Sequence, residues 1–275
     1  MYPITFVTDC SDGNARARLS TRIGALFGQS PTIIAADGPD PESFAALTLL
    51  DCLRSTESLG EAGYPTITLL NIAPRDGIWP NGVPFCYFRY GRHLVASTLN
   101  ARALSLVRRE LKIKQVYVTD VREVLEAATA WSDLGTAEVR RIADTQFRSL
   151  WYLPLLAKWV SEDRPVPSRL DDVPSLGDDD PVVVSVVDNF GNCKFDCRPD
   201  DIGFTVGAPL PVAGQDVKCY RHLTDVPRGS AGLIPGSSGF DFVELVIRGA
   251  SAADRFGLQP GDAPLGRHTT PPYAV

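Results

Sequence analysis

A cluster of polar and aromatic residues interrupts an apolar run at 182–187. Asp188, Phe190 and Asn192 follow that run within five residues, and the alternating pattern resumes at Cys193. An amide can pair with a purine edge, an aromatic ring can stack on a base, and a carboxylate can bind an ammonium group or ribose hydroxyls. Gly191 would let the backbone turn or approach a ligand. The segment is therefore either part of a nucleoside site or an Asx-type turn with Phe190 in the core, and taken alone it favours the turn.

Polar residues also end two predicted strands in the first half of the chain. Asp9 ends the strand at 4–9, and Asn71 lies in the strand at 66–74. In open α/β sheets, ligands bind beyond the carboxyl ends of the strands. Both side chains are therefore candidates for one wall of a site. Cys10 follows Asp9 and could line the same wall, although a small buried thiol at a strand end is the simpler interpretation.

The elements that must position these residues alternate along the first 160 residues. Apolar patterns predict strands at 4–9, 32–37, 66–74 and 114–120, a hairpin or two strands at 84–97, and helices at 15–27, 41–54, 100–111 and over most of 136–160. This alternation predicts an α/β fold, with an α/β/α sandwich domain around a mostly parallel sheet at residues 1–162.

The composition changes after that domain. Residues 163–181 are rich in proline and acidic side chains, which is typical of a solvated linker. From 182 to 275 the pattern is one of short strands with many glycines and prolines. We therefore expect a smaller, β-barrel-like C-terminal domain.

Composition excludes several classes of protein. The chain has 275 residues, 44% of them hydrophobic, and a net charge of −6 without a dense basic patch, which argues against nucleic-acid or anionic-membrane partners. No apolar run approaches the roughly 20 residues of a membrane span, and the first residues look like a strand and not a signal peptide. The six cysteines lack zinc-ligand spacing. We expect reduced thiols, no metal and a cytoplasmic location.

A second segment connects the polar cluster to a known family. Residues 236–262 read GSSGFDFVELVIRGASAADRFGLQPGD, and with DNFGN at 188–192 they resemble the C-terminal domain of the S-adenosyl-L-methionine (SAM) hydroxide adenosyltransferases. These are SAM hydrolases related to the fluorinases and chlorinases. Thr8-Asp9 and GRHLVASTLNARALSLV at 91–107 also resemble the family. The resemblance implies SAM or another adenosine derivative as ligand, no further cofactor, and a homotrimer with sites at the subunit interfaces.

The resemblance assigns expected roles to individual residues. Asp9 matches the carboxylate that binds both ribose hydroxyls, Asp188 the one facing the methionine ammonium, and Asn192 the amide that contacts adenine. The remaining expected binding residues are Phe190 beside this group, Ser237 and Ser238 near the methionine carboxylate, Arg248 and Ala250 beside adenine, and Cys10 and Ser11 next to Asp9.

The catalytic positions depart from the family pattern. The family strand motif VVDPGVG is here LLNIAPR, which places Asn71 at its Asp, and Arg75 aligns loosely with an arginine of the following loop. The family TFHGRD motif aligns with TQFRSL, which replaces its His, Gly and Arg by Phe147, Arg148 and Ser149. Asn71 cannot accept a proton and Phe147 cannot relay one, so the usual activation of water is missing. His93 or His222 could compensate only if folding brings one close.

Four functions remain open. The first is a SAM-binding enzyme that cleaves SAM by nucleophilic substitution without the usual hydrolytic residues, for example by adenosyl transfer to a soft anion. The second is displacement within the methionine part, which would release methylthioadenosine. The third is slow hydrolysis to adenosine and methionine, and the fourth is a nucleoside-binding trimer without turnover. The presence of Asp9, Asp188 and Asn192 argues against the fourth.

Overall fold

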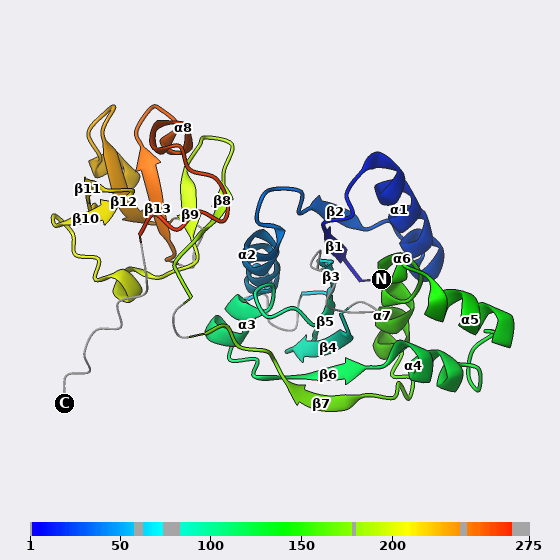
Figure 1. The fold of residues 1–275 in the computed structure, drawn as a ribbon. Coiled ribbons are helices and arrows are strands. Elements are labelled where there is room, and N and C mark those ends of the chain that lie inside the picture. The colour runs from blue at the N-terminus through cyan, green and yellow to red at the C-terminus, as the bar shows by residue number, and fades with distance from the viewer. Residues whose placement is uncertain (1, 58–62, 74–82, 178–179, 237–240, 266–275) are drawn as a thin grey trace, which may run out of the picture. The chain divides into compact units, whose positions relative to one another are not determined.

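Two compact units make up the computed structural model (Figure 1). One comprises Met1–Asp37 and Thr48–Ser175, and the other comprises Gly38–Leu47 and Leu176–Val275. The structure describes residues 2–57, 63–73, 83–177, 180–236 and 241–265. We describe each unit by itself.

A seven-stranded sheet forms the centre of the first unit, in the order β2-β1-β3-β5-β4-β6-β7. Five strands run in one direction, whereas β4 and β7 run against them. The carboxyl ends of β1, β3, β5 and β6 therefore share one edge of the sheet. The strands are β1 (Ile4–Thr8), β2 (Thr32–Ala35), β3 (Ile67–Asn71), β4 (Phe85–Tyr90), β5 (His93–Thr98), β6 (Gln115–Thr119) and β7 (Arg169–Asp172).

Amphipathic helices cover this sheet. Figure 1 shows α1 and α7 on one face and α3 on the other. Leu19 and Ile23 of α1 and Leu153 and Leu156 of α7 belong to one buried cluster with Phe6 of β1. The helices of this unit are α1 (Gly13–Phe27), α3 (Ser105–Glu110), α4 (Val121–Ala128), α5 (Thr136–Asp144), α6 (Arg148–Trp151) and α7 (Leu153–Ser161), and α2 (Pro41–Arg54) has residues in both units.

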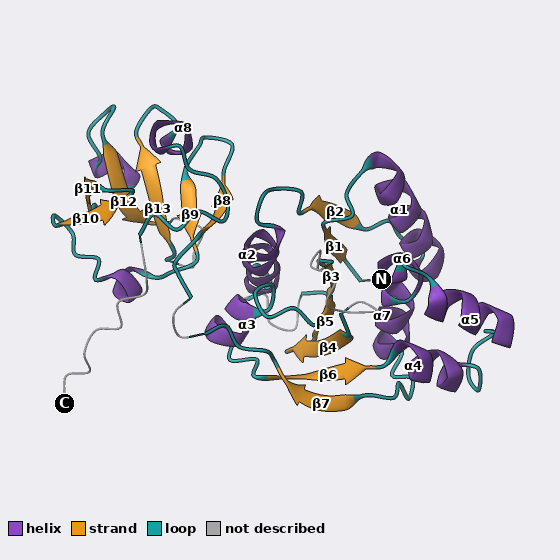
Figure 2. Ribbon diagram, viewed as in Figure 1, coloured by secondary structure: helices purple, strands orange, loops and turns teal. Residues whose placement is uncertain are grey.

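Antiparallel sheets build the second unit (Figure 2). One has the order β12-β13-β9-β8 and the other pairs β10 with β11. Phe195, Leu233, Val243 and Leu245 lie in its buried core. Its elements are β8 (Val184–Val187), β9 (Cys193–Phe195), η2 (Pro199–Ile202), β10 (Pro209–Val212), β11 (Gln215–Lys218), η3 (Leu223–Asp225), β12 (Ala231–Pro235), β13 (Val243–Ile247) and α8 (Ala252–Phe256). The predicted α/β class, with a mostly parallel sheet followed by a β-rich region, is confirmed.

The segment expected to be a linker differs from the prediction at one point. Residues 169–172 form β7, which pairs antiparallel with β6. Its sequence is Arg-Leu-Asp-Asp, and its one apolar side chain, Leu170, is 54% exposed. The strand therefore has no buried apolar face, and the hydrophobic pattern does not predict it. Charged residues are typical of edge strands, because they discourage pairing with another chain.

All six cysteines carry free thiols. Four of them are buried, and burial raises the pKa of Cys193 to about 12, with smaller contributions from the Asp188 and Asp262 carboxylates. None of the described helices is long and apolar enough to cross a membrane.

His93 does not lie at the edge that carries Asp9 and Asn71. It begins β5, whereas Asp9 and Asn71 lie at the carboxyl ends of β1 and β3. Its Nδ1 atom accepts a hydrogen bond from the Thr66 N–H at 3.2 Å. Burial, assisted by the charge of Arg92, lowers the pKa of the imidazole. His93 therefore cannot take the place of the family histidine, whose position is occupied by Phe147 in this chain.

This buried imidazole should make the stability of the protein depend on pH. Because the pKa of His93 is lower in the folded state, the unfolded chain binds the proton more readily as pH falls through about 6.5. The stability contributed by the neutral His93 side chain is therefore fully present above about pH 6.5. It is lost as the pH falls below that value. We expect His93→Gln to show a smaller fall in melting temperature between neutral and mildly acid pH. Parallel curves for the variant and the wild type would contradict this.

Candidate functional site

The end of β3 orients the Asp9 side chain. Thr8 and Asn71 pair in the parallel register of β1 and β3, so Asp9 lies beside the residues that follow β3. The Ala73 N–H donates to Asp9 Oδ2 at 3.1 Å, and Asn71 Nδ2 lies 3.5 Å from Asp9 Oδ1. A carboxylate has about four acceptor positions, so Asp9 can still accept hydrogen bonds from a ligand. Asn71 is 5% exposed, and its side-chain amide is directed towards Thr8 and Asp9.

Asp9 lies in a hollow of about 480 Å³ at the start of α1. The Asp12 carboxylate caps this helix by accepting from the Asn14 and Ala15 N–H groups at 2.9 and 3.0 Å. The fold brings Phe147 to the same hollow, although it is far from Asp9 in the sequence. The lining residues are Asp9, Cys10, Ser11, Asp12, Asn14, Ala15, Arg18, Gln146 and Phe147.

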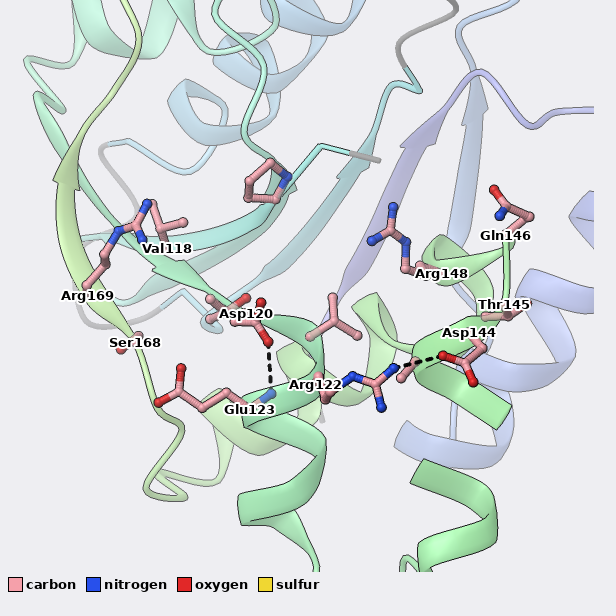
Figure 3. A pocket seen from close by; sticks show the side chains of 14 residues that line it. Val118, Asp120, Arg122, Glu123, Asp144, Thr145, Gln146, Arg148, Ser168 and Arg169 are labelled. Carbon is pink, nitrogen blue, oxygen red and sulfur yellow. Dashed lines mark hydrogen bonds and ion pairs between the residues drawn. The ribbon is translucent and has the colours of Figure 1, made fainter. Parts of the chain in front are cut away.

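Arg148 and Ser149 do not line this first hollow. Ser149 is buried, and Arg148 lines a second hollow of about 630 Å³ (Figure 3). This second hollow lies at the carboxyl end of β6 and the start of α4, and Gln146 borders both hollows. Partial burial lowers the pKa of the Arg148 guanidinium.

In the second unit, the 188–192 corner is a tight turn between β8 and β9. The Asp188 carboxylate accepts from the Phe190 and Asn192 N–H groups at 2.8 and 2.9 Å and from Asn192 Nδ2 at 2.9 Å. The Asx-type turn is therefore present, but Phe190 is not in the core, because it is 72% exposed. The corner presents a carboxylate, an amide and an aromatic ring on its surface.

The start of α8 holds this corner in place. The Ala253 N–H donates to the Gly191 carbonyl at 2.9 Å, and Ser251 caps the helix by accepting from the Asp254 N–H at 3.0 Å. A Cβ atom on Gly191 would lie 2.1 Å from Ser251 Oγ, and Gly191 has φ +79°. Only glycine fits this close approach in this left-handed conformation.

The other predicted binding residues have mixed positions. Ala250 is exposed beside Ser251, whereas Arg248 donates from Nη1 to the Thr224 and Val226 carbonyls at 3.1 and 3.4 Å. The Arg248 guanidinium therefore supports the 224–226 backbone. The predicted catalytic Arg75 and the predicted binding residues Ser237 and Ser238 lie outside the described residues.

Sequence reasoning missed Arg18, Gln146 and Ser251. Arg18 shares one face of α1 with Asn14, because residues four apart are neighbours on a helix, and this spacing could have indicated it. Gln146 directly precedes Phe147 in the aligned motif. Ser251 belongs to the segment that resembles the family, but its contact with Gly191 depends on the tertiary fold.

Comparisons with known proteins give a family match for part of the second unit. Residues 182–264 match the family model of the SAM hydroxide adenosyltransferase C-terminal domain. None of the curated proteins matches the chain.

Solved structures resemble the whole chain in fold. An uncharacterized conserved protein from Thermotoga maritima is 16% identical with a TM-score of 0.65, over 94% of this chain and 97% of its own. A conserved hypothetical protein from Thermus thermophilus is also 16% identical, with a TM-score of 0.59 over 95% of this chain and 97% of its own.

Proposed function

We infer that this chain is a divergent member of the SAM hydroxide adenosyltransferase family, and we propose that it is an enzyme that binds and cleaves SAM by nucleophilic substitution. The match over residues 182–264 supports a SAM-binding enzyme. The observation that carries the proposal is the oriented Asp9 carboxylate, which lines a hollow at the carboxyl edge of the sheet.

Asp9 has the chemistry to bind a ribose. Two vicinal hydroxyl groups can donate to the two oxygens of one carboxylate, and such charge-assisted hydrogen bonds are stronger than neutral ones. The Ala73 N–H already fixes the orientation of this carboxylate, so less freedom is lost when the ligand binds. We propose that Asp9 binds the ribose hydroxyls of SAM.

The 188–192 corner has groups that suit the rest of the ligand. We propose that Asp188 binds the methionine ammonium, that Asn192 contacts adenine and that the exposed ring of Phe190 stacks on the base. Because Asp188 already accepts three hydrogen bonds, its carboxylate is fixed in place before any ligand binds. We propose Ser237, Ser238 and Ala250 as further contacts on the resemblance alone. The homotrimer is likewise proposed only from the resemblance.

The chemistry expected in the first hollow is displacement with little proton transfer. A sulfonium is already a good leaving group, so the protein has to position the nucleophile and exclude water. Neither Phe147 nor Asn71 can remove a proton from water. We therefore propose that a nucleophile other than water, such as a soft anion, attacks C5′ of the ribose.

Restoring one family side chain should not restore hydrolysis. Phe147→His would place an imidazole beside the hollow that contains Asp9, but Asn71 would still be unable to act as a base. We expect no more adenosine from SAM than with the wild type, as measured by liquid chromatography, whereas Phe147→His combined with Asn71→Asp should release more. Rapid hydrolysis by the single variant would show that this explanation is wrong.

Product analysis tests the proposed reaction. The protein is incubated with SAM and candidate anions, and the products are identified by mass spectrometry. A 5′-substituted adenosine is expected. Free adenosine would indicate hydrolysis, methylthioadenosine would indicate displacement within the methionine part, and binding without any product would contradict enzymatic function.

A further inference from the structure

The second hollow contains charged groups that the proposed reaction does not use. Its charged lining residues are Arg122, Arg148, Arg169, Asp120, Glu123 and Asp144, so the positive and negative groups are balanced. Arg122 is neutralised by Asp144 at 2.9 Å, and Arg169 pairs with Asp171 at 3.4 Å. The guanidinium of Arg148 and the carboxylates of Asp120 and Glu123 are the charges left over.

Arg148 is suited to binding a carboxylate. Within the part of the chain that the structure describes, no hydrogen bond or ion pair engages its guanidinium, and none is drawn to it in Figure 3. The side chain is half-buried, and this burial lowers its pKa, so the charge has lost part of its hydration without gaining a carboxylate partner. A guanidinium in this state can bind a carboxylate through two parallel hydrogen bonds.

Asp120 lies on another element that borders the same hollow. It follows β6 directly, and its Oδ1 atom accepts from the Glu123 N–H at 2.9 Å, which fixes the carboxylate at the start of α4. Figure 3 shows Asp120 and Arg148 on separate elements around the hollow. The free lone pairs of Asp120 can accept from an ammonium group, which carries three donors.

Apolar side chains complete the lining. Pro84, Val118, Val121 and Ala143 also line the hollow. A simple anion would be repelled by the two unpaired carboxylates, whereas a simple cation would leave the Arg148 guanidinium without a partner. A zwitterion with a small apolar side chain matches all three kinds of surface.

We propose that the second hollow binds a free α-amino acid with an apolar side chain, its carboxylate on Arg148 and its ammonium group on Asp120. This site is separate from the proposed SAM site and does not depend on it. It would admit an amino acid as a second ligand at the same edge of the sheet.

Calorimetric titrations of the full chain with L-valine, isovalerate and isobutylamine test this proposal. Isovalerate lacks the ammonium group of valine, and isobutylamine lacks the carboxylate. We expect L-valine to bind at millimolar concentration and both analogues to bind at least tenfold more weakly, because each loses one charge-assisted contact. L-methionine serves as a second amino acid probe. If neither amino acid binds, or if isovalerate binds as well as valine, the proposal is wrong.

Matched variants locate the binding. Arg148→Gln should weaken valine binding at least tenfold and Arg148→Lys by less, because lysine keeps the charge but loses the paired geometry. Asp120→Asn keeps a residue that caps helices equally well, so weaker binding would reflect the lost charge and not misfolding. Arg140→Gln, at an exposed position of α5 outside the hollow, is the control. Equal affinities in Arg148→Gln and the control would overturn the assignment. Binding of SAM and adenosine is measured in a separate titration. If valine does not bind, the proposed cleavage of SAM is therefore unaffected.

Discussion

Asp9→Ala should weaken SAM binding at least tenfold. The variant loses a carboxylate that is held beside β3 by the Ala73 N–H at 3.1 Å and that we propose binds both ribose hydroxyls. Charge-assisted hydrogen bonds of this kind contribute about 2 kcal/mol, which corresponds to somewhat more than a tenfold change in affinity. Isothermal titration calorimetry with SAM and with adenosine measures the change directly.

Two further variants separate the effect of the charge from a change in folding. Asp9→Asn keeps the shape and should lose most of the same affinity. Asp133→Ala removes an exposed carboxylate from the loop between α4 and α5 and should bind SAM like the wild type. Unchanged affinity in Asp9→Ala, in a variant whose circular dichroism matches the wild type, would remove Asp9 from the binding site.

Gly191→Ala should strongly destabilise the second unit. The new Cβ atom would lie 2.1 Å from Ser251 Oγ and 2.8 Å from its Cα, and the residue would keep a positive φ of 79°. Strained backbone of this kind costs about 1–3 kcal/mol, and the overlap with Ser251 adds to it. We expect a lower denaturant midpoint and weaker SAM binding, because the corner holds Asp188 and Asn192.

The control for this substitution is another glycine with nearly the same backbone. Gly214 has φ +77°, but a Cβ atom there would meet no atom within 4 Å. Gly214→Ala should therefore cost only about 1 kcal/mol, the conformational part of the penalty. Equal losses in both variants would show that contact with Ser251 does not constrain the corner.

The sequence predicts that Asp9 and Asn71 lie at one edge of the sheet. It does not predict which residues from distant segments line the hollow beside Asp9. Alternating strands and helices indicate a mostly parallel sheet, and polar residues after β1 and β3 must then share an edge. The pairing of Thr8 with Asn71 confirms this arrangement. That Phe147 lines the same hollow as Asp9 came only from the family resemblance, because no local pattern connects residues so far apart.

Local chemistry predicts the 188–192 corner only in part. An aspartate followed by an asparagine and a glycine is typical of an Asx turn, and the turn is present. The exposure of Phe190 is not predictable, because hydrophobicity places an isolated aromatic residue in the core. The contact of Gly191 with Ser251 is a tertiary contact that no periodicity encodes.

The sequence pattern does not indicate β7 or α4, two of the elements around the second hollow. β7 has a polar sequence at the sheet edge, and α4 is only eight residues long, so neither has a long apolar stripe. In the sequence, Arg148 stands out only as a substitution in the aligned motif. That Arg148 and Asp120 line one hollow depends on the tertiary fold, which the sequence does not reveal.

Hydrogen–deuterium exchange of the full chain, with and without saturating SAM, shows which backbone segments become protected when the ligand binds. We expect slower exchange in peptides that contain residues 8–11 and in peptides that contain residues 188–192. Protection confined to other segments, or no protection at a SAM concentration that calorimetry shows to be saturating, would contradict SAM binding by Asp9 and the 188–192 corner.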